Sequence, residues 1–153
     1  MLEKALILAA KAHTGQVDKG GAPYILHPIR VMLACEGEKE KIVALLHDTL
    51  EDTALTAADL RRAGFPEEIV QAVCCLTRGQ KEDYMDYIAR ICENALAARV
   101  KYADLQDNLN IRRIPNPTER DFARIRKYEQ AMKRITRSVK GGREYGALDT
   151  GTL

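Results

Sequence analysis

The sequence predicts a single all-α domain, a helical bundle of about eight helices. Apolar residues recur every three or four positions through most of the chain, as they do on the buried face of a helix. No stretch alternates apolar and polar residues in the way that strands do. The 153 residues suit one domain with one hydrophobic core. We expect this domain to span residues 1–140 and to be followed by a flexible, glycine-rich tail at 141–153.

Helix-end signals and apolar spacing give the order of the helices. A loop with three glycines and a proline, residues 15–23, separates the first two. Thr56, followed three residues later by Asp59, predicts a capping box. Asn116, next to a proline, and Glu119 predict a second one at the start of the last helix. The expected helices span residues 2–14, 28–35, 38–50, 56–63, 66–77, 82–94, 95–110 and about 116–139.

The last predicted helix has an apolar stripe and a basic face. The stripe has helical spacing and is expected to be buried: Phe122, Ile125, Tyr128, Met132, Ile135 and Val139. Arg120, Arg124 and Lys127 follow one line of the same helix. Three interpretations of these arginines and lysine stay open. They form a solvated surface, they steer a polyphosphate toward a site, or they bind nucleic acid weakly.

The formal net charge of +2 hides an uneven distribution. Residues 36–59 contain seven acidic and two basic side chains, a net charge of −5. Residues 112–143 contain eleven basic and three acidic side chains, a net charge of +8. Because the total is nearly neutral, composition gives no case for a nucleic-acid-binding protein, and we expect no specific nucleic-acid partner.

The sequence also bears on the compartment. The longest uncharged apolar run, residues 5–10, is much shorter than the roughly 20 residues of a membrane span. The N-terminal residues lack the pattern of a signal peptide. The four cysteines have no C-x-x-C spacing, so we expect free, buried thiols. We therefore expect a cytoplasmic protein with no membrane partner, and a homo-oligomer stays open.

A dense group of ionisable side chains follows a buried stretch. His47 and Asp48 come directly after the apolar run at 42–46, and Glu51 and Asp52 follow. If the helix continues, His47 stacks on Glu51 and Asp48 on Asp52. Close carboxylates repel each other unless a cation or a proton lies between them, so a divalent metal is the economical explanation. Candidates for further ligands are His27 and Asp104.

Taken together, these residues have the order and rough spacing of an HD-domain metal site. Three blocks carry the similarity: "AHTGQVDKGGAPYILHPIRV", "ALLHDTLEDT" and "VKYADLQDN". The sequence resembles the hydrolase domain of RelA/SpoT-type alarmone enzymes, and more closely their small stand-alone relatives. The resemblance covers about residues 3–139. The "HDTLED" block is its sharpest piece, because it adds an acid pair that other HD proteins usually lack.

The resemblance implies a function and a set of site residues. It implies a site for one Mn²⁺, with other divalent metals left open, whose ligands are His27, His47, Asp48 and Asp104. It implies two residues that position the attacking water and manage protons, Glu51 and Asp52. It implies contacts with a nucleotide substrate from Lys19, Tyr24 and Asn108. The implied reaction removes the 3′-pyrophosphate of ppGpp or pppGpp and gives GDP or GTP and pyrophosphate.

Two positions depart from the pattern of this family. Asp18 stands before Lys19, where the family usually has a basic residue, and Leu105 follows Asp104, where the family often has one. Two alternatives therefore stay open. One is a hydrolase for another phosphorylated nucleotide, such as NADPH losing its 2′-phosphate. The other is a non-catalytic nucleotide-binding module, against which the pair Glu51 and Asp52 argues, because binding alone needs no water-activating acids.

Overall fold

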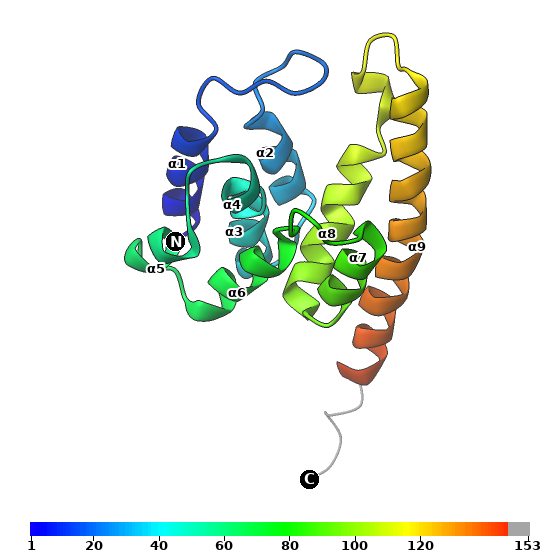
Figure 1. Cartoon of the computed structure of the whole chain (residues 1–153). Helices are drawn as coiled ribbons and strands as arrows, with labels where there is room; N and C mark the ends of the chain where they lie inside the picture. Colours follow the sequence, from blue (N-terminus) through cyan, green and yellow to red (C-terminus); the bar gives the residue numbers. More distant parts are fainter. Residues whose placement is uncertain (147–153) are drawn as a thin grey trace.

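The computed structural model describes residues 1–146 and confirms the all-α prediction (Figure 1). Within these residues the only β pairing is an isolated bridge between Val17 and Pro23. The α-helices are α1 (Leu2–Ala12), α2 (Leu26–Leu33), α3 (Glu38–Leu46), α4 (Thr49–Asp52), α5 (Ala57–Arg62), α6 (Glu67–Leu76), α7 (Tyr84–Cys92), α8 (Ala95–Asn108) and α9 (Glu119–Gly146). A short 3₁₀ helix, η1 (Ile111–Arg113), precedes α9. No helix of the described part combines the length and the apolar character that crossing a membrane requires.

The centre of the bundle is α3, which packs against α1, α2, α6 and α8. Five consecutive residues of α3, 42–46, are buried, which explains why the sequence is apolar there on every face rather than in a stripe. The second central helix, α8, packs against α2, α3, α6, α7 and α9. Figure 1 shows α9 running along the edge of the molecule beside α8. Both central helices end beside the site described below.

The predicted helix at 38–50 is interrupted at His47 and Asp48. α3 ends at Leu46 and α4 begins at Thr49, whose hydroxyl donates to the Leu46 carbonyl over 2.7 Å. The expected stacking of His47 on Glu51 therefore does not occur: the imidazole is buried, whereas the Glu51 side chain is exposed. The break therefore places the buried His47 imidazole apart from the exposed acids Glu51 and Asp52.

The two predicted capping boxes have different outcomes. At α5 the prediction is confirmed: the Thr56 hydroxyl and the Asp59 carboxylate each accept from the other residue's backbone N–H. At α9 it is wrong, because the helix begins at Glu119. There the Asp121 carboxylate accepts from the Thr118 backbone N–H over 2.8 Å and from its hydroxyl over 2.9 Å. Asn116 has φ +54° and belongs to the turn before the helix.

Two further expectations for the last helix need correction. Phe122 was expected in the buried stripe but is 41% exposed. The neighbouring Asp121 turns inward to cap the helix, which leaves the next side chain, about 100° further round the helix, toward solvent. The helix also runs to Gly146, past the predicted start of the tail at 141, since each helical glycine costs only about 1 kcal/mol. The rest of the predicted tail, 147–153, lies outside the described residues.

Candidate functional site

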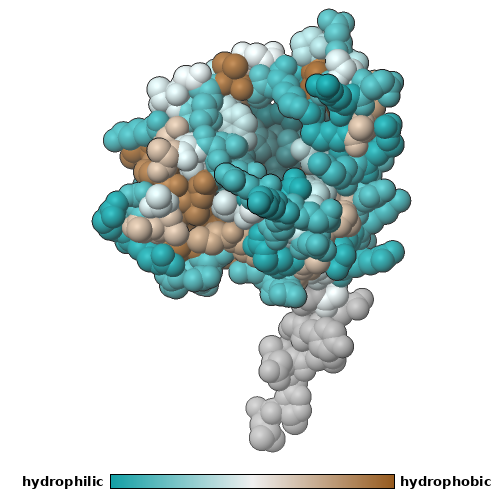
Figure 2. Space-filling model, in the orientation of Figure 1, coloured by the Kyte–Doolittle hydropathy of each residue, from teal (hydrophilic) through white to brown (hydrophobic). Residues whose placement is uncertain are grey.

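A pocket of about 480 Å³ opens on one face of the bundle, where Figure 2 shows a hollow surrounded by hydrophilic side chains. Its volume lies in the range of about 300–1,000 Å³ typical of small-molecule sites. Four acidic side chains line it: Asp18, Asp48, Glu51 and Asp104. Six basic side chains line it as well: Lys19, Arg78, Lys101, Arg113, Arg124 and Lys127. The basic side chains suit an anionic ligand, and the acidic side chains in the same pocket suit a bound cation.

The four predicted metal ligands converge beside this pocket: His27, Asp48 and Asp104 line it, and His47 is buried next to them without lining it. One ligand atom from each of His27, His47 and Asp104 lies within 4.8 Å of the other two. Asp48 joins them, since its Oδ2 lies 3.0 Å from His47 Nε2 and 3.6 Å from His27 Nε2. These side chains come from α2, from the break between α3 and α4, and from α8. Helix packing thus brings together residues that are up to 77 positions apart in the sequence.

The donor atoms fit a divalent cation. His47 Nδ1 donates to the Ala44 carbonyl over 2.6 Å, which leaves a lone pair on Nε2. This Nε2 is buried and has no hydrogen-bond partner within the described residues, although two carboxylates lie close to it. Imidazole and carboxylate ligands together suit Mn²⁺, Fe²⁺, Ni²⁺ or Zn²⁺. The cluster can therefore hold a metal ion.

The same carboxylates raise the pKa values of both histidines. Burial would lower the pKa of His47, but Asp48 and Asp104 outweigh it and hold this pKa well above its usual 6.5. Burial likewise acts against the charged form of His27, and Asp104 and Asp107 raise its pKa. The pKa of Asp48 falls to about 2, because His47 outweighs the effect of burial. Without a metal, the two imidazoles of the cluster therefore bind protons more readily than ordinary histidines do.

Metal affinity is therefore expected to fall as the pH is lowered, and the fall is expected to begin above pH 6.5. Ligation requires neutral imidazoles, and the raised pKa values of His27 and His47 let protons compete at a higher pH than at ordinary histidines. Titration of the protein with Mn²⁺ between about pH 6 and 9 measures this competition. An affinity that stays constant over this range would contradict the assignment of these imidazoles as ligands.

Asp104 is held by two residues of its own helix. Its Oδ1 faces the cluster and accepts from Asn108 Nδ2 over 2.6 Å. Its Oδ2 accepts from Lys101 Nζ over 2.8 Å, and both side chains are nearly buried. Burial would lower the pKa of Lys101, but the Asp104 carboxylate outweighs it and holds this pKa well above its usual value. Lys101 was not predicted as a site residue, although its i, i+3 spacing to Asp104 was a usable signal.

Replacing Asp104 with alanine is expected to destabilise the fold by about 3–5 kcal/mol, because it leaves the Lys101 ammonium buried without its partner. The double variant Asp104→Ala/Lys101→Met removes the uncompensated charge and is expected to recover most of this loss. Urea denaturation of both variants gives the free energies of unfolding. Equal destabilisation in the single and double variants would show that the ion pair is not the cause.

The glycine loop brings the predicted substrate residues to the pocket. Tyr24 and Lys19 both line it, and the Tyr24 hydroxyl donates to Asp48 Oδ2 over 2.5 Å. The Asp18 carboxylate accepts from the backbone N–H groups of Gly20 and Ala22 over 2.8 and 3.0 Å. Its oxygen is therefore used to fold the loop. The other departure, Leu105, is fully buried and does not line the pocket.

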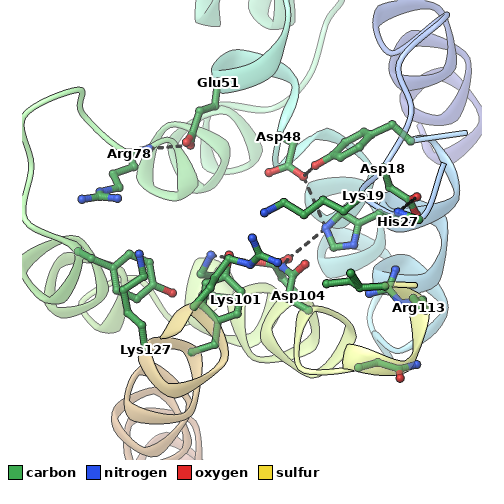
Figure 3. A pocket seen from close by; sticks show the side chains of 18 of the residues that line it. Asp18, Lys19, His27, Asp48, Glu51, Arg78, Lys101, Asp104, Arg113 and Lys127 are labelled. Atoms are coloured by element: carbon green, nitrogen blue, oxygen red, sulfur yellow. Dashed lines mark hydrogen bonds and ion pairs between the residues drawn. The ribbon is translucent and has the colours of Figure 1, made fainter. Parts of the chain in front are cut away.

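The two predicted catalytic acids have different surroundings. Glu51 lines the pocket, and its Oε2 accepts from the Arg78 backbone N–H over 3.0 Å (Figure 3). Asp52 is exposed and is not among the lining residues. Burial, together with Asp48 and Glu51, raises the pKa of Asp52. The third histidine, His13, is buried with its ring centroid 4.9 Å from that of Tyr24.

An aromatic and basic part of the pocket could not be predicted from the sequence. Tyr84 lies there, with Lys127 Nζ 4.5 Å and the Arg78 guanidinium carbon 5.5 Å from its ring centroid. In Figure 3, Arg78 and Lys127 lie across the pocket from Arg113. Of the predicted basic line on the last helix, Arg124 and Lys127 reach the pocket, and Arg120 does not line it. Arg78 comes from the loop between α6 and α7, whose fold no local pattern predicts.

Comparisons with known proteins find several similar chains. The chain is 30% identical over 144 residues to a protein of Myxococcus xanthus named GTP pyrophosphokinase, which covers 82% of this chain and 18% of that protein. It is 32% identical over 120 residues to a guanosine-3′,5′-bis(diphosphate) 3′-pyrophosphohydrolase of Aquifex aeolicus, with 71% and 17% covered. It is 31% identical over 124 residues to the bifunctional (p)ppGpp synthase/hydrolase SpoT of Escherichia coli, again with 71% and 17% covered.

A solved structure extends the likeness over most of the chain. This metazoan SpoT orthologue, described as hydrolysing ppGpp, superimposes with a TM-score of 0.72 and 26% identity, covering 92% of this chain and 85% of that one. The chain belongs to the SpoT-related family. No family model matches this SpoT-related chain. It spans less than a fifth of the length of the three curated relatives named above.

Proposed function

We propose that this SpoT-related chain is a Mn²⁺-dependent phosphohydrolase that removes the 3′-pyrophosphate from ppGpp or pppGpp. The observation that carries the proposal is the convergence of two imidazoles and two carboxylates beside a pocket that six basic side chains line. The names of the Aquifex aeolicus and Escherichia coli relatives support this reaction, as does the ppGpp hydrolysis described for the metazoan orthologue.

The metal would be held by His27, His47, Asp48 and Asp104. When bound, it supplies an acidified water and offsets negative charge on the phosphoryl oxygens. Tyr24 would keep the Asp48 carboxylate turned toward the cluster, and Lys101 would hold Asp104 from the other side. The unpartnered Nε2 of His47 favours this interpretation, because an empty buried acceptor is otherwise costly.

Glu51 would act as the general base. It would take a proton from the attacking water, whose oxygen bonds to the phosphorus attached to O3′ of the ribose. The bond between that phosphorus and O3′ breaks, and O3′ gains a proton. The products are GDP or GTP and pyrophosphate. Asp52, which is exposed beside Glu51, would pass protons between Glu51 and solvent.

The basic side chains would bind the phosphates. Lys19 is 62% exposed at the loop and has only Asp121, at 4.0 Å, as a carboxylate neighbour within the described residues, so it can turn to a phosphate. Lys127 and Arg124 would bind negatively charged phosphate groups on the α9 side of the pocket. Tyr24 and Asn108 would contact the part of the nucleotide next to the cluster, since both bond to predicted ligands. The basic face would also steer a polyphosphate toward the pocket.

The proposal includes an alarmone as the substrate and the cytoplasm as the location. The four cysteines are free, which supports the expected location in a reducing cytoplasm. The use of the Asp18 carboxylate inside the loop removes the sequence-based reason for preferring a substrate other than an alarmone.

A substrate panel tests the proposal. The purified chain is incubated with ppGpp, pppGpp or NADPH, each with Mn²⁺, with Mg²⁺ or with a chelator. We expect release of pyrophosphate from ppGpp and pppGpp that depends on Mn²⁺. Release of orthophosphate from NADPH, with the alarmones left intact, would overturn the substrate in favour of the 2′-phosphatase alternative. Binding of the nucleotides without any turnover would favour the non-catalytic module.

A further inference from the structure

The imidazole of His27 has a partner outside the cluster. His27 Nδ1 lies 2.6 Å from Asp107 Oδ2, and its Nε2 lies 3.1 Å from Asp104 Oδ1. Both carboxylates can only accept, but a metal ion in the cluster would take the lone pair of Nε2, so the one proton of the neutral ring would lie on Nδ1 and be donated to Asp107. In this arrangement Asp107 would favour that tautomer of His27 and hold the ring so that Nε2 faces the cluster.

Asp107 is itself held by two arginines. Arg30 Nε donates to its Oδ1 over 2.8 Å and Arg30 Nη2 to its Oδ2 over 3.1 Å, which is the two-pronged geometry of a strong ion pair. Arg113 Nη2 lies 3.0 Å from Oδ2 and also donates to the backbone carbonyl of Asp107. Burial raises the pKa of Asp107, but His27 and Arg30 outweigh it, so the carboxylate stays ionised.

Arg113 connects Asp107 to the glycine loop. A Cβ atom on Gly20 would lie 2.5 Å from the Arg113 carbonyl oxygen, so the loop rests directly on η1. Arg113 and the neighbouring loop residue Lys19 both line the pocket. A continuous set of contacts therefore runs from the loop through Arg113 and Asp107 to His27.

We propose that Asp107 is a positioning residue that orients His27 toward the metal and that is kept in place by Arg30 and Arg113. This inference rests on the metal site in the proposed function. The two imidazoles then differ in a testable way. His47 donates to a backbone carbonyl, which no substitution of a side chain removes, whereas His27 depends on a replaceable carboxylate. Such outer partners typically change metal affinity by about 10- to 100-fold.

The test measures Mn²⁺ affinity without any nucleotide, from the electron paramagnetic resonance signal of free Mn²⁺ titrated with the full chain. We expect Asp107→Ala to weaken binding by about 10- to 100-fold. Asp107→Asn keeps an oxygen that can accept from His27 Nδ1, and we expect it to recover most of the loss. The matched control is Asp121→Ala, which removes an equally buried, arginine-paired carboxylate outside the cluster and is expected to leave Mn²⁺ affinity unchanged.

A spectroscopic signature gives a readout that does not depend on a folded variant. At alkaline pH the Nδ1 proton of His27 in the unaltered protein is expected to give a far-downfield proton resonance, because it is held in a short bond to a carboxylate. Absence of this resonance, or an unchanged Mn²⁺ affinity in folded Asp107→Ala, would overturn the role of Asp107 and leave the proposed hydrolase intact. If the unaltered protein binds no divalent metal, the proposed function fails together with this inference.

Discussion

Replacing His47 with glutamine is expected to abolish Mn²⁺-dependent hydrolysis of ppGpp. The variant loses Nε2, a buried acceptor without a hydrogen-bond partner within the described residues, and with it a ligand that no neighbouring side chain can replace. The metal supplies several kcal/mol of transition-state stabilisation, so the loss corresponds to about 10³-fold or more in kcat/KM. Steady-state release of pyrophosphate and Mn²⁺ titration of the same sample measure the two effects together.

His13 provides a matched control for this substitution. It is equally buried, and its Nε2 also has no hydrogen-bond partner within the described residues, but it lies outside the cluster and does not line the pocket. His13→Gln is therefore expected to keep Mn²⁺ affinity. Equal loss of metal in the two variants would show that His47 acts through the fold and not as a ligand.

Replacing Glu51 with glutamine is expected to lower kcat by about 10²- to 10⁴-fold, which is the usual contribution of a positioned general base. The amide keeps the size of the side chain and an oxygen that can accept from the Arg78 backbone N–H. Mn²⁺ affinity is expected to stay within a few-fold of the unaltered protein, because Glu51 is not part of the ligand cluster. Single-turnover kinetics at saturating Mn²⁺ isolate the chemical step.

Glu93→Gln is the control for the loss of one acidic side chain. Glu93 is exposed at the end of α7 and does not line the pocket, so its substitution is expected to leave kcat unchanged. A Glu51→Gln variant that turns over at the unaltered rate would remove Glu51 from the chemistry. Loss of Mn²⁺ binding in that variant would instead make Glu51 part of the metal site.

The fold could be predicted wherever the information is local. The apolar run at 42–46 placed a buried helix, and Thr56 with Asp59 placed the start of α5, because helical periodicity and capping act over a few residues. The break at His47 and the inward turn of Asp121 depend on what packs against them. For this reason the sequence predicted one continuous helix at the first position and the wrong cap at the second.

The candidate site could be predicted only in part, and the reason is distance along the chain. His47 and Asp48 stood out as neighbours in the sequence, and the resemblance joined His27 and Asp104 to them as one ligand set. Several of the residues that bond to the site lie far from it in the sequence and are brought to it only by the packing of the fold. Arg30 meets Asp107 across 77 positions, and Arg78 reaches Glu51 from a loop. Asp18 shows the opposite error: as a departure from the family pattern it left another substrate open, but its oxygen folds the loop.

The uneven charge of the chain acquires a structural explanation. The acidic stretch contributes Asp48 and Glu51 to the pocket, and the basic segment contributes Arg113, Arg124 and Lys127 to the same pocket. The remaining basic residues of α9 extend this charge beyond the pocket, where it can act only over a Debye length of about 8–10 Å at physiological salt. The chain is nearly neutral because an acidic and a basic segment offset each other, and both segments contribute side chains to the same pocket.

The most direct test of the central claim is the fate of oxygen from water during turnover. The purified chain is incubated with ppGpp and Mn²⁺ in ¹⁸O-enriched water, and the products are followed by ³¹P nuclear magnetic resonance. The proposed reaction predicts GDP without label and one pyrophosphate that carries a single ¹⁸O atom, because water attacks the phosphorus next to O3′. Orthophosphate as the product, label in GDP, or no turnover with Mn²⁺ would contradict it.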